Sequence, residues 1–357
     1  MISRFEIVAS NSPRPKAEHI IFCDGSGGRL FNPATDLELS HWRPNQTPPE
    51  YRGDTSTEAC FRFLGHPRRE PWTVAVNNHL DVDGILSVYA LVCSEQAREL
   101  RETLISAAEM GDFWGWGPPA AQCVFQGVTL LMDQARERDY DHAAIYKLAF
   151  DRVPGLAAGS DSETASIEAS LEPLRRQAAL VEEGHIVRTQ PGERFAHYVV
   201  SLLIAGDDDA RAAYVPQFNE AISDKCALWP HVQSRQDDQR VRLVSTERRD
   251  GWFHALWYPG YLWADTEFRW RTPGITYRDG MESYDLDHPA LFDALQELQS
   301  LETADGTWAA GNGASPFHRK LQSQFPVVAR FTAADGQPAK STLEPDRVAS
   351  VLRRAFE

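Results

Sequence analysis

One short stretch constrains the fold more than any other, because in it a buried strand passes through a polar turn into a helix. Residues 71–77 (PWTVAVN) form an apolar run with β-branched residues, which predicts a buried strand. From Ile85 onward apolar residues recur at helical spacing, which predicts a helix directly after the turn. A strand that leads into a helix is typical of a parallel sheet, where ligands collect beyond the carboxyl ends of the strands.

The turn itself carries a histidine and two aspartates at alternate positions, His79, Asp81 and Asp83. Alternate residues of an extended segment point the same way, so these side chains are expected to enter one cleft. Two carboxylates and an imidazole suit Mn²⁺ or Mg²⁺. Gly84 allows a sharp turn, and the N-terminus of the next helix offers N–H donors to an anion. Asp-x-Asp-Gly also occurs in surface turns, but the apolar flanks favour an interior position.

The pattern of the chain changes along its length, from α/β to helical to mixed α+β. We predict a parallel-sheet α/β domain over residues 1–210 and a smaller α+β domain over residues 240–357 that caps the site or holds substrate. The predicted strands are residues 5–8, 19–23, 71–77, 241–245, 251–262 and 326–331. The predicted helices include residues 193–204, 289–301 and 345–356, and a helix that ends at Gly111.

Charge and cysteine content limit the class of partner. The formal net charge of −15 argues against long nucleic acid, which needs clustered Lys and Arg. A small phosphorylated ligand remains compatible, because a bound divalent cation supplies local positive charge. The five scattered cysteines form no C-x-x-C pair, which indicates reduced thiols in a cytoplasm. There is no apolar run of about 18 residues, so no membrane span is expected. The oligomeric state stays open.

The string HLDVDGILS at positions 79–87 resembles the first motif of the DHH phosphoesterase superfamily, in which a strand ends in His-x-Asp-x-Asp-Gly. The resemblance implies a DHH-like domain in which His79, Asp81 and Asp83 bind metal, typically Mn²⁺. It also implies that Asp81 and Asp83 are catalytic in phosphoester hydrolysis. The block AAEMGDF resembles a later motif of the superfamily and implies that Asp112 is a further metal ligand.

The chain lacks the Asp-His-His triplet after which that superfamily is named. The nearest string is Asp141-His142-Ala143, which has the form of a helix start with Asp141 as its cap. Two explanations stay open. Either residues from elsewhere replace the missing ligands, or the site is reduced to a single ion.

The string DVDGIL also resembles the first motif of haloacid-dehalogenase-type phosphatases. That resemblance implies that Asp81 is a nucleophile and Asp83 a general acid, with Mg²⁺ between enzyme and substrate. The acidic run at residues 207–209 then corresponds to a late acidic motif. Both resemblances imply metal-dependent phosphate chemistry, but they differ on whether a covalent intermediate forms.

Several loops are further candidates for ligand binding. Residues 38–58 resemble an uncharacterised bacterial family, and His41, Arg43 and Asn45 are candidates to hold an anion there; the alternative is a loop bonded to its own backbone. His318 lies in a glycine-containing loop that the DHH resemblance relates to phosphate binding. The glycine-rich residues 24–29 are interpreted as a turn, with a loop that binds phosphate through its backbone N–H groups as the alternative. The aromatic segment 252–271 predicts core strands, with base stacking as the alternative.

The sequence therefore predicts a cytoplasmic phosphoesterase that uses Mn²⁺ or Mg²⁺ to hydrolyse a small phosphate ester or phosphodiester. The predicted metal ligands are His79, Asp81, Asp83 and Asp112. Two alternatives stay open: a haloacid-dehalogenase-like phosphatase, and a catalytically inactive DHH-like protein that binds a ligand.

Overall fold

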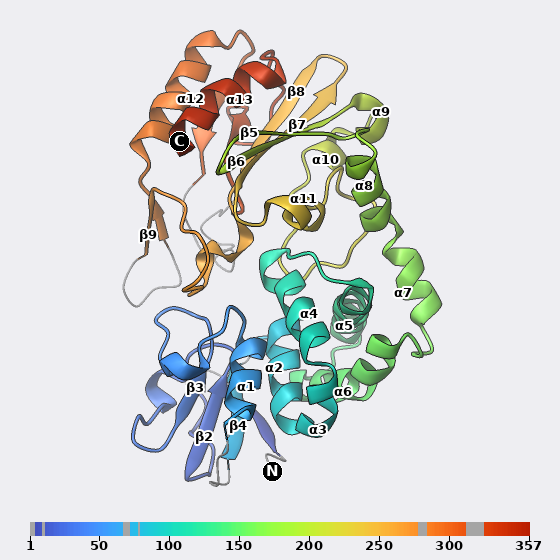
Figure 1. Cartoon of the computed structure of the whole chain (residues 1–357), viewed down its shortest axis with the longest axis vertical. Coiled ribbons are helices and arrows are strands. Elements are labelled where there is room, and N and C mark those ends of the chain that lie inside the picture. Colours follow the sequence, from blue (N-terminus) through green and yellow to red (C-terminus); the bar gives the residue numbers. More distant parts are fainter. Residues whose placement is uncertain (1–3, 9–10, 67–71, 78, 278–283, 312–324) are drawn as a thin grey trace. The chain divides into compact units, whose positions relative to one another are not determined.

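A computed structural model describes residues 4–8, 11–66, 72–77, 79–277, 284–311 and 325–357. The chain forms two compact units (Figure 1). Unit 1 contains Met1–Leu171, Phe218–Ala221 and Ala264–Phe268, and unit 2 contains Glu172–Gln217, Ile222–Trp263 and Arg269–Glu357. The predicted α/β class is confirmed, because the chain combines many helices with a parallel sheet and a mixed sheet.

Unit 1 is built on a four-stranded sheet in the order β1-β4-β2-β3, with every neighbouring pair parallel. Its strands are β1 (Phe5–Val8), β2 (His19–Cys23), β3 (Leu37–Leu39) and β4 (Trp72–Asn77). Its helices are α1 (Ser56–Leu64), α2 (Val82–Val92), α3 (Ser94–Glu99), α4 (Arg101–Phe113), α5 (Pro119–Glu137), α6 (His142–Ala158) and α7 (Thr164–Ser170). Two short 3₁₀ turns, Gly28–Leu30 and Pro49–Tyr51, lie in its loops.

The central strands of this sheet are apolar on both faces, as expected of a parallel sheet covered on both sides. Val74, Ala75 and Val76 of β4 have no exposed surface, and neither do Ile20 and Ile21 of β2. Polar side chains therefore become available only where each strand ends. Because β2 and β4 are parallel neighbours, their carboxyl ends lie at one edge of the sheet, and the residues that follow them meet there.

Unit 2 is built on a six-stranded sheet in the order β11-β12-β8-β7-β6-β5. Its neighbouring pairs are antiparallel except β6 and β7, which are parallel and are joined by a long connection with three helices. Its strands are β5 (Val187–Gly192), β6 (Phe195–Val200), β7 (Val241–Arg248), β8 (Gly251–Trp257), β11 (Thr307–Ala310) and β12 (Val327–Thr332), with a separate pair β9 (Ile275–Tyr277) and β10 (Tyr284–Leu286).

The helices of unit 2 lie between and after these strands. They are α8 (Glu172–Glu182), α9 (Leu202–Ala205), α10 (Asp209–Ala212), α11 (Pro230–Asp237), α12 (Pro289–Leu301) and α13 (Pro345–Arg353), with 3₁₀ turns at Gly260–Trp263 and Arg354–Phe356. Figure 1 shows α12 beside α13, and the two helices contact each other. Among the described helices, none combines the length and the apolar character that a membrane span requires.

Two predictions about the middle of the chain differ from the structure. The helix predicted at residues 193–204 is wrong, because Phe195–Val200 is strand β6 and only Leu202–Ala205 is helical. β5 pairs with β6 and β6 pairs with β7, which places residues 187–200 in unit 2. The first segment of unit 1 therefore ends at Leu171 rather than at 210. The two units are also similar in size, whereas a smaller second domain was expected.

Gly111 was predicted to end a helix, and this is wrong because α4 continues to Phe113. The glycine is explained instead by space: a Cβ atom at Gly111 would lie 2.6 Å from Oδ1 of Asn219. Other local predictions are confirmed. The helix Pro289–Leu301 has the predicted bounds, and the side chain of Asp141 caps α6 by accepting the N–H of Ala144.

Candidate metal centre

The carboxyl ends of β2 and β4 bring together a first group of three metal-ligating side chains. Asp24 directly follows β2, and His79 and Asp81 follow β4. The Nε2 atom of His79 lies 2.5 Å from Oδ2 of Asp24 and 3.2 Å from Oδ2 of Asp81. One ligand atom from each of these residues falls within 4.8 Å of the others, a spacing that one metal ion can fill.

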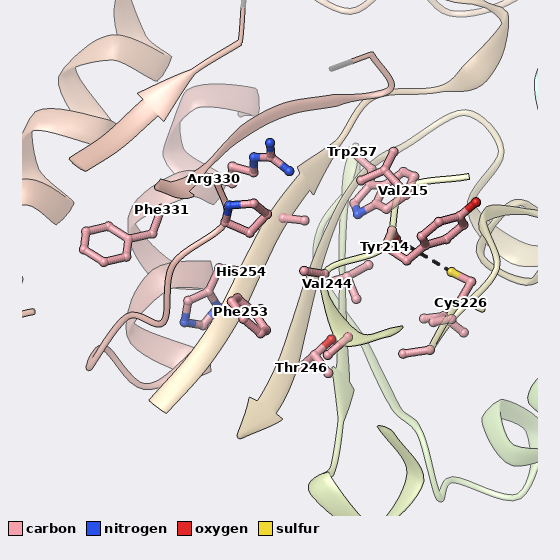
Figure 2. Close-up of a pocket in the computed structure, with 16 residues that line it drawn as sticks. Tyr214, Val215, Cys226, Val244, Thr246, Phe253, His254, Trp257, Arg330 and Phe331 are labelled. Carbon is pink, nitrogen blue, oxygen red and sulfur yellow. Dashed lines mark hydrogen bonds between the residues drawn. The ribbon is translucent and has the colours of Figure 1, made fainter. Parts of the chain in front are cut away.

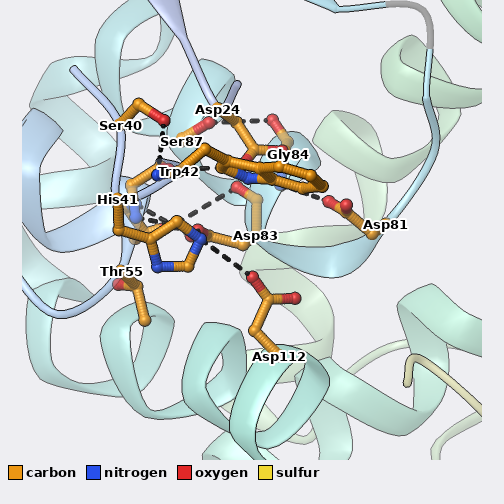
Figure 3. Close-up of polar contacts among 12 residues, drawn as sticks. Asp24, Ser40, His41, Trp42, Thr55, Asp81, Asp83, Gly84, Ser87 and Asp112 are labelled. Carbon is orange, nitrogen blue, oxygen red and sulfur yellow. Dashed lines mark hydrogen bonds and ion pairs between the residues drawn. The ribbon is translucent and has the colours of Figure 1, made fainter. Parts of the chain in front are cut away.

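A second group shares Asp24 with the first and adds His41 and Asp83, all three without exposed surface. The Nε2 atom of His41 lies 3.6 Å from Oδ2 of Asp83 and 3.3 Å from Oδ2 of Asp112 (Figure 3). Asp112 therefore reaches this group through His41, although it belongs to neither three-residue set. We call the six residues Asp24, His41, His79, Asp81, Asp83 and Asp112 the Asp24 centre.

Two helix N-termini hold the aspartates of the motif in place. Asp81 is the N-cap of α2 and accepts the N–H of Gly84 at 2.7 Å. Both carboxylate oxygens of Asp83 accept backbone N–H groups from the first turn of α1, those of Ser56 and Thr57, at 2.8 Å each. Exposed N–H groups and the helix dipole stabilise a carboxylate at such a position. The N–H groups predicted to bind a substrate anion are thus used by the protein's own carboxylates.

Gly84 is required by space rather than by a sharp turn, since it lies in the first turn of α2. A Cβ atom there would lie 2.7 Å from Oδ2 of Asp24, 2.9 Å from Oδ1 of Asp81 and 2.9 Å from the hydroxyl of Tyr146. The Tyr146 hydroxyl on α6 is buried and, within the described part of the chain, has no hydrogen-bond partner. A buried hydroxyl therefore lies beside the same two carboxylates.

A later segment of unit 1 joins two parts of the centre through Asn219. Its Oδ1 accepts the N–H of Val82 at 2.8 Å, and its Nδ2 donates to Oδ1 of Asp112 at 3.3 Å. The backbone N–H of Asn219 also donates to the carbonyl of Gly111. Asn219 thus ties the start of α2 to the end of α4, which fixes Asp112 relative to the motif.

Burial and mutual repulsion shift the titration of these groups strongly. Burial, together with the charge of Asp24, raises the pKa of Asp83 to about 6, and burial also holds the pKa of Asp112 well above its usual range. For Asp24 burial acts in the same direction, but the neighbouring His79 outweighs it, and the pKa falls to about 2. Burial alone would lower the pKa of His41, yet the surrounding carboxylates raise it to about 9.

The donors fit a divalent cation, as the hydrogen bond on the far side of His41 shows. Its Nδ1 lies 2.6 Å from the carbonyl oxygen of Asp54, so Nδ1 carries a proton and donates it. In the neutral ring the Nε2 lone pair then faces two carboxylates, which is repulsive unless a proton or a metal ion lies between. Metal-ligating histidines typically donate their second N–H to a carbonyl in this way.

The charge of the centre leads to the same conclusion. Four carboxylates lie beside two imidazoles in the interior of unit 1. Buried carboxylates are costly unless they are paired or coordinate metal. Without metal, the raised pKa of both histidines lets two protonated imidazoles offset part of this charge. With both imidazoles neutral, two divalent ions would balance the four negative charges.

A comparison with known protein families places this region of the chain. Residues 4–190, just over half of the chain, match a family of unknown function (DUF6687). The chain belongs to this family. No curated protein and no solved structure matches it. All six residues of the Asp24 centre, and Tyr146, lie inside the part that matches DUF6687, whereas Asn219 lies outside it.

The residues predicted to bind substrate contact other groups of the protein instead. His41 is fully buried in the centre instead of facing a ligand from a surface loop. Arg43 pairs with Asp265 at 3.0 Å. The side chain of Asn45 accepts the N–H of Thr47, as expected for the alternative in which the loop bonds to its own backbone. His318 lies outside the described residues.

The residues of the remaining hypotheses are not members of the Asp24 centre. Residues 207–209, the acidic run to which the haloacid-dehalogenase resemblance gave a role, belong to unit 2. There Asp207 pairs with Arg249 and Asp209 pairs with Arg248. His142, from the string nearest to the missing triplet, starts α6. Burial, the Arg136 charge and His79 lower the pKa of His142, which places it within electrostatic reach of the centre.

Sequence reasoning missed Asp24, because residues 24–29 were interpreted as a turn. The signal was present: Asp24 follows the apolar strand HIIFC, just as His79 and Asp81 follow β4. Applying the strand-end rule to both predicted strands would have selected it. Tyr146 and Asn219 carry no such signal, because helix packing and a distant loop bring them to the site.

Proposed function

We propose that this chain is a divalent-metal-dependent phosphoesterase that acts on a small phosphate ester or phosphodiester, with Mn²⁺ or Mg²⁺ in the Asp24 centre. The observation that carries the proposal is the sharing of Asp24 by two histidine–carboxylate groups. Two adjacent ions bridged by one carboxylate are a common arrangement for phosphate hydrolysis. The resemblance of residues 79–87 to the DHH first motif supports the same class of reaction.

In this proposal the protein's own residues divide the work. Asp24, His79 and Asp81 hold one ion, and Asp24, His41 and Asp83 hold the other, while Asp112 orients His41. When bound, a divalent ion polarises a phosphoryl oxygen and lowers the pKa of water. The buried Tyr146 hydroxyl stays protonated, since burial raises its pKa, and it can donate a hydrogen bond to a substrate oxygen.

A basic group near the motif supports binding of a phosphate. Arg136 on α5 donates to the carbonyl of Leu80 at 3.1 Å, and half of its side-chain surface is exposed. Arg136 therefore places a positive charge beside Leu80, next to the His79 side of the centre. The net charge of −15 favours a small substrate over a long polymer. We also propose a cytoplasmic location, since all five cysteines are free.

The test combines metal binding with substrate turnover. Calorimetry would measure Mn²⁺ and Mg²⁺ binding to the wild type and to Asp81→Asn, with the exposed Asp151→Asn on α6 as a matched control. The metal-loaded proteins would then be assayed with phosphate monoesters and diesters such as p-nitrophenyl phosphate and bis-p-nitrophenyl phosphate. We expect the wild type and the control to bind two ions and to cleave one class of substrate, and Asp81→Asn to bind one ion fewer and to lose turnover. Unchanged metal affinity in Asp81→Asn would refute the site.

One observation favours a second candidate, a catalytically inactive metal-binding protein. Both oxygens of Asp83 are already engaged by backbone N–H groups, a geometry that also suits a purely structural centre. In that case the ions would raise the unfolding temperature, but no substrate in the panel would be cleaved. Loss of one bound ion in Asp81→Asn, without any turnover by the wild type, would select this candidate.

A further inference from the structure

The two groups of the Asp24 centre differ in their exposure to solvent, although they share Asp24. In the first group the side chain of His79 is 27% exposed and that of Asp81 is 8% exposed. In the second group the side chains of His41 and Asp83 have no exposed surface. We call the first group the open position and the second group the closed position. Asp24 belongs to both and is itself fully buried.

The ligands of the closed position are fixed by contacts on their far side. The Nδ1 atom of His41 lies 2.6 Å from the carbonyl oxygen of Asp54. The two oxygens of Asp83 accept the N–H groups of Ser56 and Thr57 at 2.8 Å each. Such supporting contacts orient metal ligands and raise the affinity for the ion. An ion in the closed position therefore meets ligands that are already in place.

Asp112 encloses the closed position further. Its Oδ2 lies 3.3 Å from Nε2 of His41, and its side chain is only 1% exposed (Figure 3). The side chain of Asn219 donates to the other carboxylate oxygen of Asp112 at 3.3 Å. An ion in the closed position thus has three carboxylates beside it, those of Asp24, Asp83 and Asp112. Water replaces these buried ligands only when the protein around them moves, which makes release of the ion slow.

The open position is reached from solvent at His79, which is the most exposed of the six residues of the centre. The ring of Trp42 packs beside that of His79, with the centroids 5.6 Å apart, yet the imidazole keeps its exposed surface. The Tyr146 hydroxyl lies near this position, because it and Oδ1 of Asp81 are each 2.9 Å from the point where a Cβ atom of Gly84 would lie. Water, a chelator or a substrate therefore meets the ion of the open position first.

We infer that the centre holds its two divalent ions unequally. The ion in the closed position stays bound, whereas the ion in the open position exchanges readily, and its occupancy controls turnover. Release of an ion needs a path by which water reaches its ligands, and such a path is present at the open position. The concentration of free cation therefore regulates the enzyme without emptying the closed position. Control of turnover rests on the proposed function, but the difference in exchange rests on metal binding alone.

The number of bound ions reports on the Asp24 centre, because the described part of the chain offers no other group of three metal-ligating residues. The pocket on the six-stranded sheet of unit 2 illustrates this, since its lining contains no carboxylate (Figure 2). Its histidine, His254, lies 3.0 Å from the carbonyl oxygen of Leu343, and its Cys226 thiol donates to the carbonyl of Tyr214. Each retained ion is therefore assigned to the open or the closed position.

The experiment counts the ions that remain on the full chain after chelation. Protein loaded with Mn²⁺ is mixed with excess EDTA, and samples are freed of the chelator by gel filtration at intervals. Mass spectrometry measures the retained Mn²⁺, and turnover of p-nitrophenyl phosphate and bis-p-nitrophenyl phosphate is measured on the same samples. The variants are Asp81→Asn, which removes a ligand of the open position, and Asp112→Asn, which loosens the closed position. The exposed Asp151→Asn on α6 is the matched control, and thermal unfolding without metal reports whether each variant is folded.

We expect the wild type and the control to lose one ion at least about tenfold faster than the other. Turnover should be lost together with the first ion and restored by added Mn²⁺. Asp81→Asn should keep only the slowly released ion, and Asp112→Asn should release that ion about tenfold faster than the wild type does. One common rate for both ions overturns the inference, as does turnover that survives loss of the first ion.

The outcomes also separate this inference from the proposed function. A wild type that binds no Mn²⁺ contradicts both. Two ions with unequal rates of release, but no cleavage of either substrate, support the unequal exchange and contradict the proposed hydrolysis.

Discussion

The carboxylate of Asp24 and the imidazole of His79 lie 2.5 Å apart, although 55 residues separate them in the chain. Parallel pairing of β2 with β4 creates this contact, because it brings the ends of both strands to one edge of the sheet. Asp24 also accepts from the indole N–H of Trp42 and the hydroxyl of Ser56, each at 3.1 Å. Asp24 is therefore the residue through which the two metal-ligating groups are joined.

Replacing Asp24 should remove more metal than replacing any other aspartate of the centre. Asp24→Asn alters both groups, so we expect Mn²⁺ affinity to fall by at least about tenfold at each position. Asp81→Asn alters one group only and should leave one ion bound at the position of His41 and Asp83. Counting bound Mn²⁺ by electron paramagnetic resonance checks this. Equal numbers of ions in Asp24→Asn and wild type would show that Asp24 is not a shared ligand.

Adding a methyl group at Gly84 should crowd the carboxylates of Asp24 and Asp81. An alanine inside a helix is normally favoured over glycine by about 0.5–1 kcal/mol. At Gly84 the new Cβ would meet Asp24 at 2.7 Å, so we expect a net loss of about 1–3 kcal/mol in the free energy of unfolding, together with weaker Mn²⁺ binding.

The matched control for this variant is Gly155→Ala in α6, where the nearest atoms lie 3.4 Å from an added Cβ. That change should leave the free energy of unfolding unaltered or slightly raised, and metal binding intact. Urea unfolding and calorimetry on both variants check the pair. The steric explanation of Gly84 would fail if both alanine variants behaved alike.

Tyr146→Phe should separate catalysis from folding and from metal binding. The hydroxyl is buried and has no hydrogen-bond partner among the described residues, so its removal should cost little stability or even add some. We expect Mn²⁺ affinity to change by less than about threefold and kcat on the phosphate substrate to fall by about tenfold or more. A Tyr146→Phe enzyme with full kcat would leave the hydroxyl without a catalytic role.

Acid should weaken unit 2 through a buried chain of hydrogen bonds. His197 lies 3.0 Å from the Ser245 hydroxyl, which lies 2.9 Å from His254. Burial lowers the pKa of both histidines to about 4. Between the ordinary histidine pKa near 6.5 and that value, the unfolded chain binds more protons than the folded chain. Stability is therefore complete above about pH 6.5 and is lost as the pH falls to about 4, by roughly 3 kcal/mol for each histidine.

The variant that checks this effect is His197→Gln, which keeps a donor near Ser245 but does not titrate. Urea unfolding of the wild type and this variant between pH 7 and 4 should show a shallower pH dependence in the variant, since one of the two histidines is gone. Parallel curves for the two proteins would mean that other groups cause the acid sensitivity.

Local patterns predicted those parts of the fold and site that depend on neighbouring residues. The alternation of His79, Asp81 and Asp83 after an apolar strand predicted that all three side chains enter one cleft. His79 and Asp81 lie 3.2 Å apart, whereas Asp83 lies in the first turn of α2 and belongs to the group of His41. Their predicted role as metal ligands stays a prediction. The wrong helix at residues 193–204 shows the limit, because Phe195–Val200 is apolar enough for either state and pairing with β7 decides for a strand.

The sequence by itself determined which segments are apolar, where β1, β2 and β4 end, and which polar groups follow those ends; β3 (Leu37–Leu39) was not predicted. Only the tertiary structure decided that Asp24 and His41 join the motif and that Tyr146 faces it. The physical reason is that strand order and helix packing depend on contacts between distant segments. The alternation of side chains along a strand, in contrast, is a property of the local backbone.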